Sequence, residues 1–270
     1  MARKRVIFSL LYSHGSFMLS RNFRLQRAGS VTWLLRNYNF GSVATCIDEL
    51  LILDVGRGET DSDAFLSDVR QVIDACFIPV ALGGRIDSFD AAKRLIASGA
   101  DKIVVNSVFD TDPDVVARIA DSFGSQAVIG GIDVRRGAEG GYQVFTEQGG
   151  TPLTVAPAVR VDAMLAAGAG EILVQSIDND GTGQGFDHAT VAALGVSLNA
   201  PVIICGGCGK SDHMRSALLR PDIDAVATAN LFNFIGDGLQ TARGELLRDG
   251  LDLARWDSAD IEQLRDVLGR

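Results

Sequence analysis

A pair of carboxylates stands directly behind an apolar run in the second half of the chain. Residues 172–174 are Ile, Leu and Val, and they are followed closely by Asp178, Asp180, Gly181 and Thr182. A short apolar run bounded by turn-forming residues is typical of a buried parallel strand, and a polar, glycine-bearing loop often carries chemistry on a rigid scaffold. The two carboxylates could act as acid, base or ligand anchor, or they could only cap a tight turn between a strand and a helix.

Two pairs of glycines end two other apolar runs. These pairs, and the residues that stand one unit after each of them, are Gly83-Gly84 with Asn106-Ser107, and Gly206-Gly207 with Ala229-Asn230. Glycine lets backbone N–H groups approach an anion closely, and the N-terminus of a following helix adds its dipole. Such glycines could also do no more than turn a strand into a helix. Because the pattern occurs twice, we favour two phosphate sites and a substrate with a phosphate at each end.

Charged residues stand at or near the starts of four apolar runs, at Arg5, Glu49, Lys102 and Glu171. The N-terminal face of a barrel usually serves stability, so an ordinary ring of salt bridges is one interpretation. A charged ring on a barrel axis could also gate a small molecule that passes through.

The composition excludes several classes of protein. The 270 residues are 47% apolar and carry a formal net charge of −9, which suits one sizeable core and gives no basic stripe for nucleic acid. No uncharged apolar run reaches the ~18 residues of a membrane span. The first strand candidate begins at Arg5, which leaves no room for a signal peptide.

The four cysteines, Cys46, Cys76, Cys205 and Cys208, show no paired metal-ligand spacing. Cys205 and Cys208 form a C-x-x-C sequence, a weak indication of redox or zinc chemistry, since no second pair exists. We therefore expect a reduced, cytoplasmic protein with no metal and no cofactor.

Eight strand candidates follow one another along the chain, at residues 5–11, 49–54, 78–82, 102–105, 127–132, 172–174, 201–205 and 225–229. Helical patterns separate most of them; the clearest is capped by Asp87 or Ser88 and ended by Gly99. Alternation of strands and helices predicts parallel pairing, and eight units predict a closed (β/α)8 TIM barrel of the α/β class. Residues 13–39 have a poor helical period and predict a mobile loop, while residues 137–150 predict an inserted hairpin.

The chain repeats itself at about half its length. Residues 5–11, 48–53, 78–84 and 100–109 return as residues 127–133, 170–175, 200–207 and 223–232. Self-similarity in four segments predicts two (β/α)4 halves, at about 1–123 and 124–255, within one domain that ends in a helix over 256–270. Matching strand ends would then lie across one mouth.

The repeat exposes an asymmetry at that mouth. Asp133 ends an apolar strand where general acid–base work would be done, but its partner in the first half is Leu11. A site built on two opposed carboxylates would have Asp at both positions.

These segments resemble the HisF-type cyclase subunit of imidazole glycerol phosphate synthase, from histidine biosynthesis, nearly end to end. The most specific pieces are GGRIDSFDAAKRLIASGADKIVVNS, FGSQAVIGGIDVRR, YQVFT, GAGEILVQSIDNDGTGQGFD and PVIICGGCG. In that family a glutaminase subunit docks on the bottom of the barrel as a heterodimer partner. Its ammonia passes a charged gate and meets a substrate with two phosphates.

The resemblance implies a role for each matching position. It implies a gate and glutaminase interface at Arg5, Glu49, Asp101, Lys102 and Glu171. It implies catalytic carboxylates at Asp133 and Asp180. It implies phosphate binding at Gly83, Gly84, Asn106, Ser107, Gly181, Thr182, Gly206, Gly207 and Asn230, the last in place of the usual Ser.

Two departures from the family pattern concern the chemistry. Leu11 stands where the family has an Asp that is essential for cyclisation, and Leu19 stands where it has a functional Lys, with Arg21 the nearest cation. An offshoot of the family, associated with surface-polysaccharide genes and sugar amidation, also has that Leu. We favour this ammonia-delivering paralogue over an authentic cyclase, a non-catalytic partner that activates a glutaminase, or a plain phosphosugar isomerase.

Overall fold

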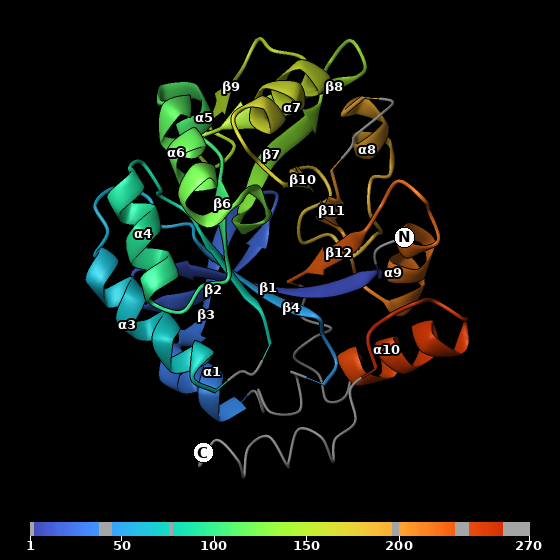
Figure 1. The fold of residues 1–270 in the computed structure, drawn as a ribbon. Coiled ribbons are helices and arrows are strands. Elements are labelled where there is room, and N and C mark those ends of the chain that lie inside the picture. Colours follow the sequence, from blue (N-terminus) through green and yellow to red (C-terminus); the bar gives the residue numbers. More distant parts are fainter. Residues whose placement is uncertain (1–2, 38–44, 76–77, 196–199, 230–237, 256–270) are drawn as a thin grey trace.

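Eight parallel strands close into a barrel at the centre of the molecule (Figure 1). The computed structural model describes residues 3–37, 45–75, 78–195, 200–229 and 238–255. The barrel closes because β10 pairs with β7 as well as with β11. In order around the barrel the strands are β1 (Arg5–Ser13), β4 (Glu49–Asp54), β5 (Val80–Gly83), β6 (Lys102–Val105), β7 (Val128–Arg136), β10 (Glu171–Ser176), β11 (Val202–Cys205) and β12 (Ala225–Thr228). The predicted (β/α)8 barrel is confirmed.

Helices surround the barrel on the outside (Figure 1). In chain order they are α1 (Val31–Asn37), α3 (Ser62–Ile73), α4 (Phe89–Ala97), α5 (Val108–Thr111), α6 (Pro113–Phe123), α7 (Pro157–Ala166), α8 (Ala189–Ala193), α9 (Ser211–Leu218) and α10 (Gly238–Arg248), with a 3-10 turn at Ser125–Ala127. The cap of α4 is Ser88, whose hydroxyl accepts a hydrogen bond of 3.2 Å from Ala91 N. The helix predicted over 256–270 lies outside the described residues.

The prediction of a mobile loop over residues 13–39 is wrong. This segment forms a hairpin of β2 (Ser16–Arg21) and β3 (Arg24–Ser30), which extends β1 and leads into α1. Its turn residues, Asn22 and Phe23, both have positive φ, of 51° and 62°, as a two-residue type I′ turn requires. Side chains alternate with a period of two along these strands, which explains the poor helical period of this segment.

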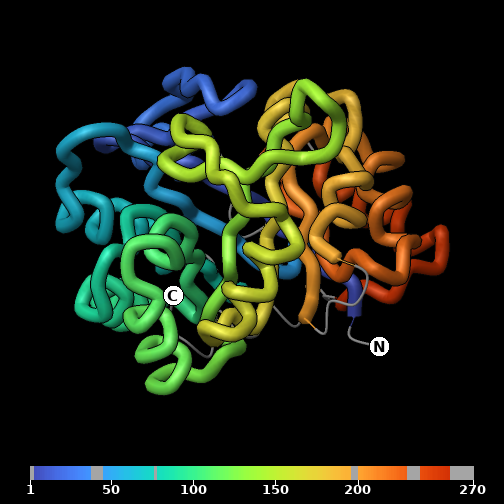
Figure 2. Tube along the Cα trace, turned by 90° about the horizontal axis from the view of Figure 1, so that it is seen from above, coloured from blue at the N-terminus to red at the C-terminus, as the bar shows by residue number. Residues whose placement is uncertain are grey.

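The predicted hairpin over residues 137–150 is confirmed. β7 continues past the barrel and pairs antiparallel with β8 (Tyr142–Thr146), which pairs in turn with β9 (Thr151–Pro152). Figure 2 shows this hairpin and the β2–β3 hairpin at the same end of the barrel, away from the N-terminus. That end is the mouth.

Strand alternation divides the core into two parts. One apolar set lies between the barrel and the helices, and a smaller set fills the barrel itself. The inner set includes Ile7, Leu51, Val104, Ile129 and Leu173. These side chains form an apolar layer between the charged strand starts and the mouth.

Candidate functional site

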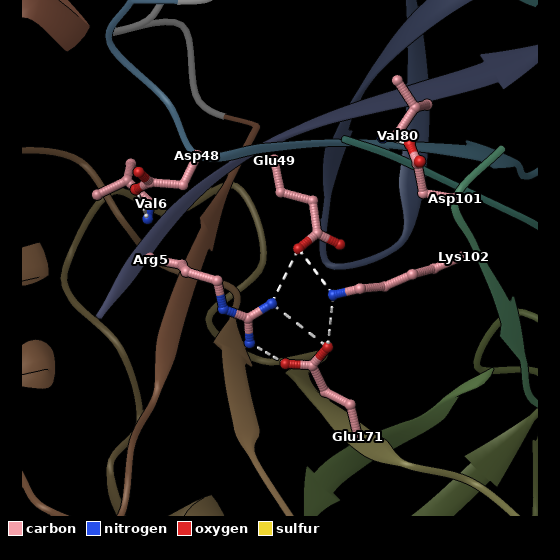
Figure 3. A network of polar contacts seen from close by, with 8 residues as sticks. All are labelled: Arg5, Val6, Asp48, Glu49, Val80, Asp101, Lys102 and Glu171. Atoms are coloured by element: carbon pink, nitrogen blue, oxygen red, sulfur yellow. Dashed lines mark hydrogen bonds and ion pairs between the residues drawn. The ribbon is translucent and has the colours of Figure 1, made fainter. Parts of the chain in front are cut away.

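Four charged side chains meet on the barrel axis at the starts of the strands (Figure 3). Arg5 donates to Glu49 over 2.9 Å and pairs closely with Glu171. Lys102 Nζ lies 3.0 Å from a carboxylate oxygen of each glutamate. The four residues predicted from sequence therefore form one closed ring of two cations and two anions.

The two carboxylates of this ring are buried, with side-chain exposures of 4% for Glu49 and 6% for Glu171, against 22% and 21% for Arg5 and Lys102. Burial by itself would lower the pKa of the Arg5 guanidinium, but hydrogen bonds and charge from the two glutamates raise it. Arg5 therefore stays protonated. One buried oxygen, Glu49 Oε1, has no hydrogen-bond partner within the described structure, so the ring retains an acceptor for a small donor molecule.

Asp101 does not join the ring; its carboxylate accepts a hydrogen bond of 2.8 Å from Val80 N on the neighbouring strand (Figure 3). Asp48 and Asp224 make the same contact with Val6 N and Val202 N, at 2.8 and 2.9 Å. Aspartates directly before strands thus satisfy an N–H group at the start of the adjoining strand. Asp48 and Asp101 thereby help to position strands that present the ring.

Two cavities open at the mouth and share a wall. The first, of about 440 Å³, lies over the first half of the barrel and is lined by Gly84, Asn106, Ser107 and Asp133 among others. The second, of about 260 Å³, lies over the second half and is lined by Asp180, Gly181, Gly206, Gly207 and Ala229 among others. Leu11, Ser20 and Gln175 line both cavities. Asn230 lies outside the described residues.

The two glycine pairs are not equivalent. Gly83 is the last residue of β5, and a Cβ there would meet Val104 and Leu53 inside the barrel at under 3 Å. It belongs to the strand and does not line either cavity. Counted from the strand ends, Gly84 (φ 92°) corresponds to Gly206 (φ 95°). The repeat is therefore shifted by one residue here, and Arg85 occupies the position of Gly207.

Asp133 lies in the first cavity at the point where β7 leaves the barrel. Asn106 Nδ2 donates to its carboxylate over 3.0 Å. Burial, together with the charge of Asp180, raises the pKa of Asp133 to about 7, although the Asn106 hydrogen bond lowers it. A carboxyl group that titrates near neutrality can both donate and accept a proton.

Asp180 is held by the β2–β3 hairpin. Its Oδ2 accepts hydrogen bonds from Ser20 Oγ at 2.5 Å and from Phe23 N at 3.0 Å, and its carbonyl accepts one from Asn22 N at 3.0 Å. Burial raises the pKa of Asp180, and the hydrogen bonds from the Ser20 hydroxyl and from Phe23 N oppose that rise. In this structure Asp180 fastens the hairpin over the second cavity.

The neighbours of Asp180 are also structural. A Cβ at Gly181 would lie 2.0 Å from Ser20 O, so only glycine fits under the hairpin. Thr182 Oγ1 donates to Asn179 O over 2.8 Å and does not line either cavity. Asp178 accepts from Arg136 N over 2.9 Å.

Leu11 lies between the two cavities and is 7% exposed. It is the repeat partner of Asp133, so an apolar side chain faces the shared space where the second half presents a carboxylate. Leu19, on β2, lines the second cavity. The structure thus brings both departures from the family pattern to the mouth.

Several mouth residues were missed from the sequence. Gln175 follows Glu171 and Leu173 on the inward face of β10, so strand alternation could have found it. Arg24 was not considered, and Arg21 was noted only as the cation nearest to Leu19; both line the second cavity because the unpredicted hairpin carries them there. Arg57 and Arg85 line the first cavity. The one sequence signal for this was their position shortly after the ends of two strands.

Cys205 and Cys208 are buried thiols, and burial raises the pKa of both, to about 12 for Cys208. In the part of the chain that is described, no group of three or more His, Cys, Asp or Glu side chains is arranged to hold a metal ion. None of the described helices is long and apolar enough to cross a membrane.

Comparison of the sequence with known proteins identifies its relatives. Residues 27–236 match the family described as histidine biosynthesis protein. The chain is 41% identical over 257 residues to a protein of Parasynechococcus marenigrum provisionally named imidazole glycerol phosphate synthase subunit hisF2, with 95% of each chain covered. It is 36% identical over 250 residues to the imidazole glycerol phosphate synthase subunit HisF of Chlorobium limicola, covering 92% of this chain and 97% of that one. A Pseudomonas aeruginosa protein, also provisionally named hisF2, is 34% identical over 237 residues, covering 87% of this chain and 93% of that one.

Proposed function

The chain belongs to the histidine biosynthesis protein family, with relatives named as HisF subunits of imidazole glycerol phosphate synthase, and on that premise we propose that it is an ammonia-using synthase subunit. A partner glutaminase of the HisH type supplies the ammonia at the bottom of the barrel. The ammonia reaches a phosphorylated acceptor at the mouth. The observation that carries this proposal is the closed ring of Arg5, Glu49, Lys102 and Glu171, at the opposite end of the barrel from the cavity that Asp133 lines.

The ring and the layer above it select for neutral ammonia. Glu49 Oε1, buried and without a partner in the described structure, offers a hydrogen-bond acceptor at the entrance. Beyond the ring the interior is lined by Ile7, Leu51 and Leu173. An isolated cation is strongly disfavoured among apolar side chains, whereas a small neutral molecule is not, so ammonia passes where ammonium does not.

At the mouth, Asp133 handles the protons. When ammonia adds to a carbonyl carbon of the acceptor, the N–C bond forms and the electron pair of the C=O bond moves to oxygen. The Asp133 carboxyl, whose pKa lies at about 7, donates a proton to that oxygen and then accepts one from the new ammonium group. Two glycine-lined cavities, with Gly84 in one and Gly206 in the other, support an acceptor with two phosphates.

Leu11 decides between two versions of this function. A cyclisation that needs two opposed carboxylates lacks one of them, because Leu11, the repeat partner of Asp133, presents an apolar side chain to the same cavity. We therefore favour a divergent paralogue that serves the amidation of a sugar. An authentic cyclase of histidine biosynthesis remains the alternative that the relatives' names support.

A tagged copy of the chain, expressed in its own organism, tests the proposal. It is expected to capture a glutamine-hydrolysing subunit that mass spectrometry identifies. The captured complex is then given amide-15N glutamine and a small-molecule extract of the same cells, and the label is expected in an organic product.

The variant Lys102→Ala is expected to leave capture intact but release the label as free ammonium, because it opens the ring. Lys93→Ala, at an exposed lysine of α4, is the matched control and keeps the label in the product. Capture of no glutaminase contradicts the proposal. Equal transfer by Lys102→Ala and by the control contradicts the route through the barrel.

A further inference from the structure

Arginines gather at the rim of the mouth, although the protein carries a net charge of −9. A third, open hollow adjoins the first cavity, between the β2–β3 turn, the β4–α3 loop and the β8–β9 turn. Among its lining residues are four arginines and one glutamate: Arg24, Arg57, Arg85, Arg135 and Glu147. Arg135 lies 3.7 Å from Asp178, and Glu147 accepts a hydrogen bond from Thr151.

The guanidinium groups of Arg24, Arg57 and Arg85 have no carboxylate partner within the described part of the chain. Arg57 donates to Gln148 Oε1 at 3.1 Å and to Phe23 O at 3.3 Å. Arg85 donates to Gly56 O at 2.9 Å. These bonds go to neutral oxygens, so they fix the guanidinium groups of Arg57 and Arg85 in place but leave their positive charge uncompensated.

Neither Asp54 nor Glu147 forms an ion pair with these three arginines within the described residues. Asp54 lies near enough to Arg85 for the guanidinium to lower its pKa, but burial raises that pKa, and the two side chains form no ion pair. The Asp54 carboxylate instead accepts a hydrogen bond from Gly56 N at 2.9 Å. With four arginines against the single carboxylate of Glu147, the hollow keeps an excess of positive charge, and such an excess attracts an anion.

The backbone gives a second, independent indication. Arg85 has a φ of 58°, in the left-handed region, and it occupies the position that Gly207 holds in the other half of the barrel. A residue with a side chain is disfavoured there, and such strain tends to persist where function requires it. The first half has therefore placed a guanidinium group where the second half keeps a bare glycine.

We propose that Arg24, Arg57 and Arg85 form a third anion subsite at the mouth, which binds a phosphate-type oxyanion of the acceptor in addition to the two at the glycine cavities. Guanidinium groups suit such oxyanions because their planar N–H donors match the geometry of the oxygens. This inference rests on the proposed function in that the subsite belongs to the same substrate mouth. It makes the acceptor a polyanion that extends beyond a bisphosphate.

Titration with inorganic phosphate, followed by NMR, resolves each subsite separately. The side-chain Nε–H signals of Arg57 and Arg85 report the rim. The backbone amide of Gly84 reports the first glycine cavity, which these arginines also line, and the amides of Gly206 and Gly207 report the second. Chloride at matched ionic strength is the reference, and the exposed Arg70 of α3 is the internal control. The rim signals are expected to shift and saturate with phosphate, whereas that of Arg70 drifts without saturation.

The double variant Arg57→Gln with Arg85→Gln is expected to weaken phosphate binding at Arg24 by about tenfold. It should leave the dissociation constant reported by the Gly207 amide unchanged, as should Arg70→Gln. If the double variant does not fold, Arg24→Gln is used, because the Arg24 side chain is exposed on the hairpin, and the Arg85 signal is then followed.

Rim signals that behave like Arg70, or a dissociation constant that the variants leave unchanged, overturn the third subsite. Saturation at the rim with no response from Gly206 and Gly207 instead keeps this subsite and removes the two-phosphate part of the proposed function. The two failures are therefore distinguishable.

Discussion

In the proposed function, the chemistry at the mouth depends on Asp133. Its carboxyl group lies between an amide donor, Asn106, and a second carboxylate, Asp180, in a site where burial disfavours its charge. The sequence predicted Asp133 from its place at the end of an apolar strand. It could not predict the raised pKa, because that depends on burial and on neighbours from the loops after β6 and after β10.

The variant Asp133→Asn is expected to stabilise the protein at pH 8 while abolishing ammonia transfer. The native pKa of about 7 lies above the ~3.9 of an unfolded Asp. The native state therefore keeps its proton up to higher pH than the unfolded state does. The native state accordingly loses stability as the pH rises from ~4 to about 7, by about 2 kcal/mol after allowance for solvent.

Urea unfolding at pH 4 and at pH 8 measures this effect. Asparagine cannot ionise, so the variant should gain over the wild type at pH 8 and show little difference at pH 4. Asp121→Asn, at an exposed position in α6, is the control. A variant less stable than the wild type at pH 8 would show that the Asp133 charge is favoured in the fold.

At the scale of elements, the β2–β3 hairpin covers the second cavity and also carries its cations. The barrel strands were predicted to within a few residues because buried parallel strands read as apolar runs. The hairpin was missed because its turn is Asn22-Phe23, with no glycine to mark it. The sequence pairs Gly83-Gly84 with Gly206-Gly207 because both segments contain two consecutive glycines. The ends of β5 and β11 show instead that Gly84 corresponds to Gly206.

The hairpin depends on a few hydrogen bonds to Asp180, so Ser20→Ala should loosen it. Loss of the 2.5 Å bond from Ser20 Oγ leaves a buried carboxylate with one donor fewer, at a cost of about 1–3 kcal/mol. Limited trypsin digestion, followed by mass spectrometry, is expected to show faster cleavage after Arg21 and Arg24.

Ser88→Ala is the matched control for this experiment. It removes the cap of α4 and about 1 kcal/mol of stability, but it does not touch the hairpin. Equal cleavage rates in Ser20→Ala and Ser88→Ala would mean that Asp180 does not hold the hairpin closed.

At the scale of the whole molecule, the two similar halves of the barrel contribute different residues to the mouth. Both halves contribute to the ring at the strand starts, through Glu49 and Glu171. At the other end of the barrel they differ, since the first half has Leu11 and Arg85 where the second has Asp133 and Gly207. The repeat in the sequence was sufficient to find Leu11, but the rim arginines required the three loops to be seen together.

This asymmetry carries the central claim, that the machinery for ammonia addition is present while one carboxylate for cyclisation is absent. The most direct measurement gives the purified chain the bisphosphate nucleotide of the histidine pathway together with an ammonium salt and follows product formation. The wild type is expected to show no turnover, Leu11→Asp to gain measurable turnover, and Leu11→Asn to gain none. Turnover by the wild type at the rate of a histidine-pathway cyclase would contradict the account.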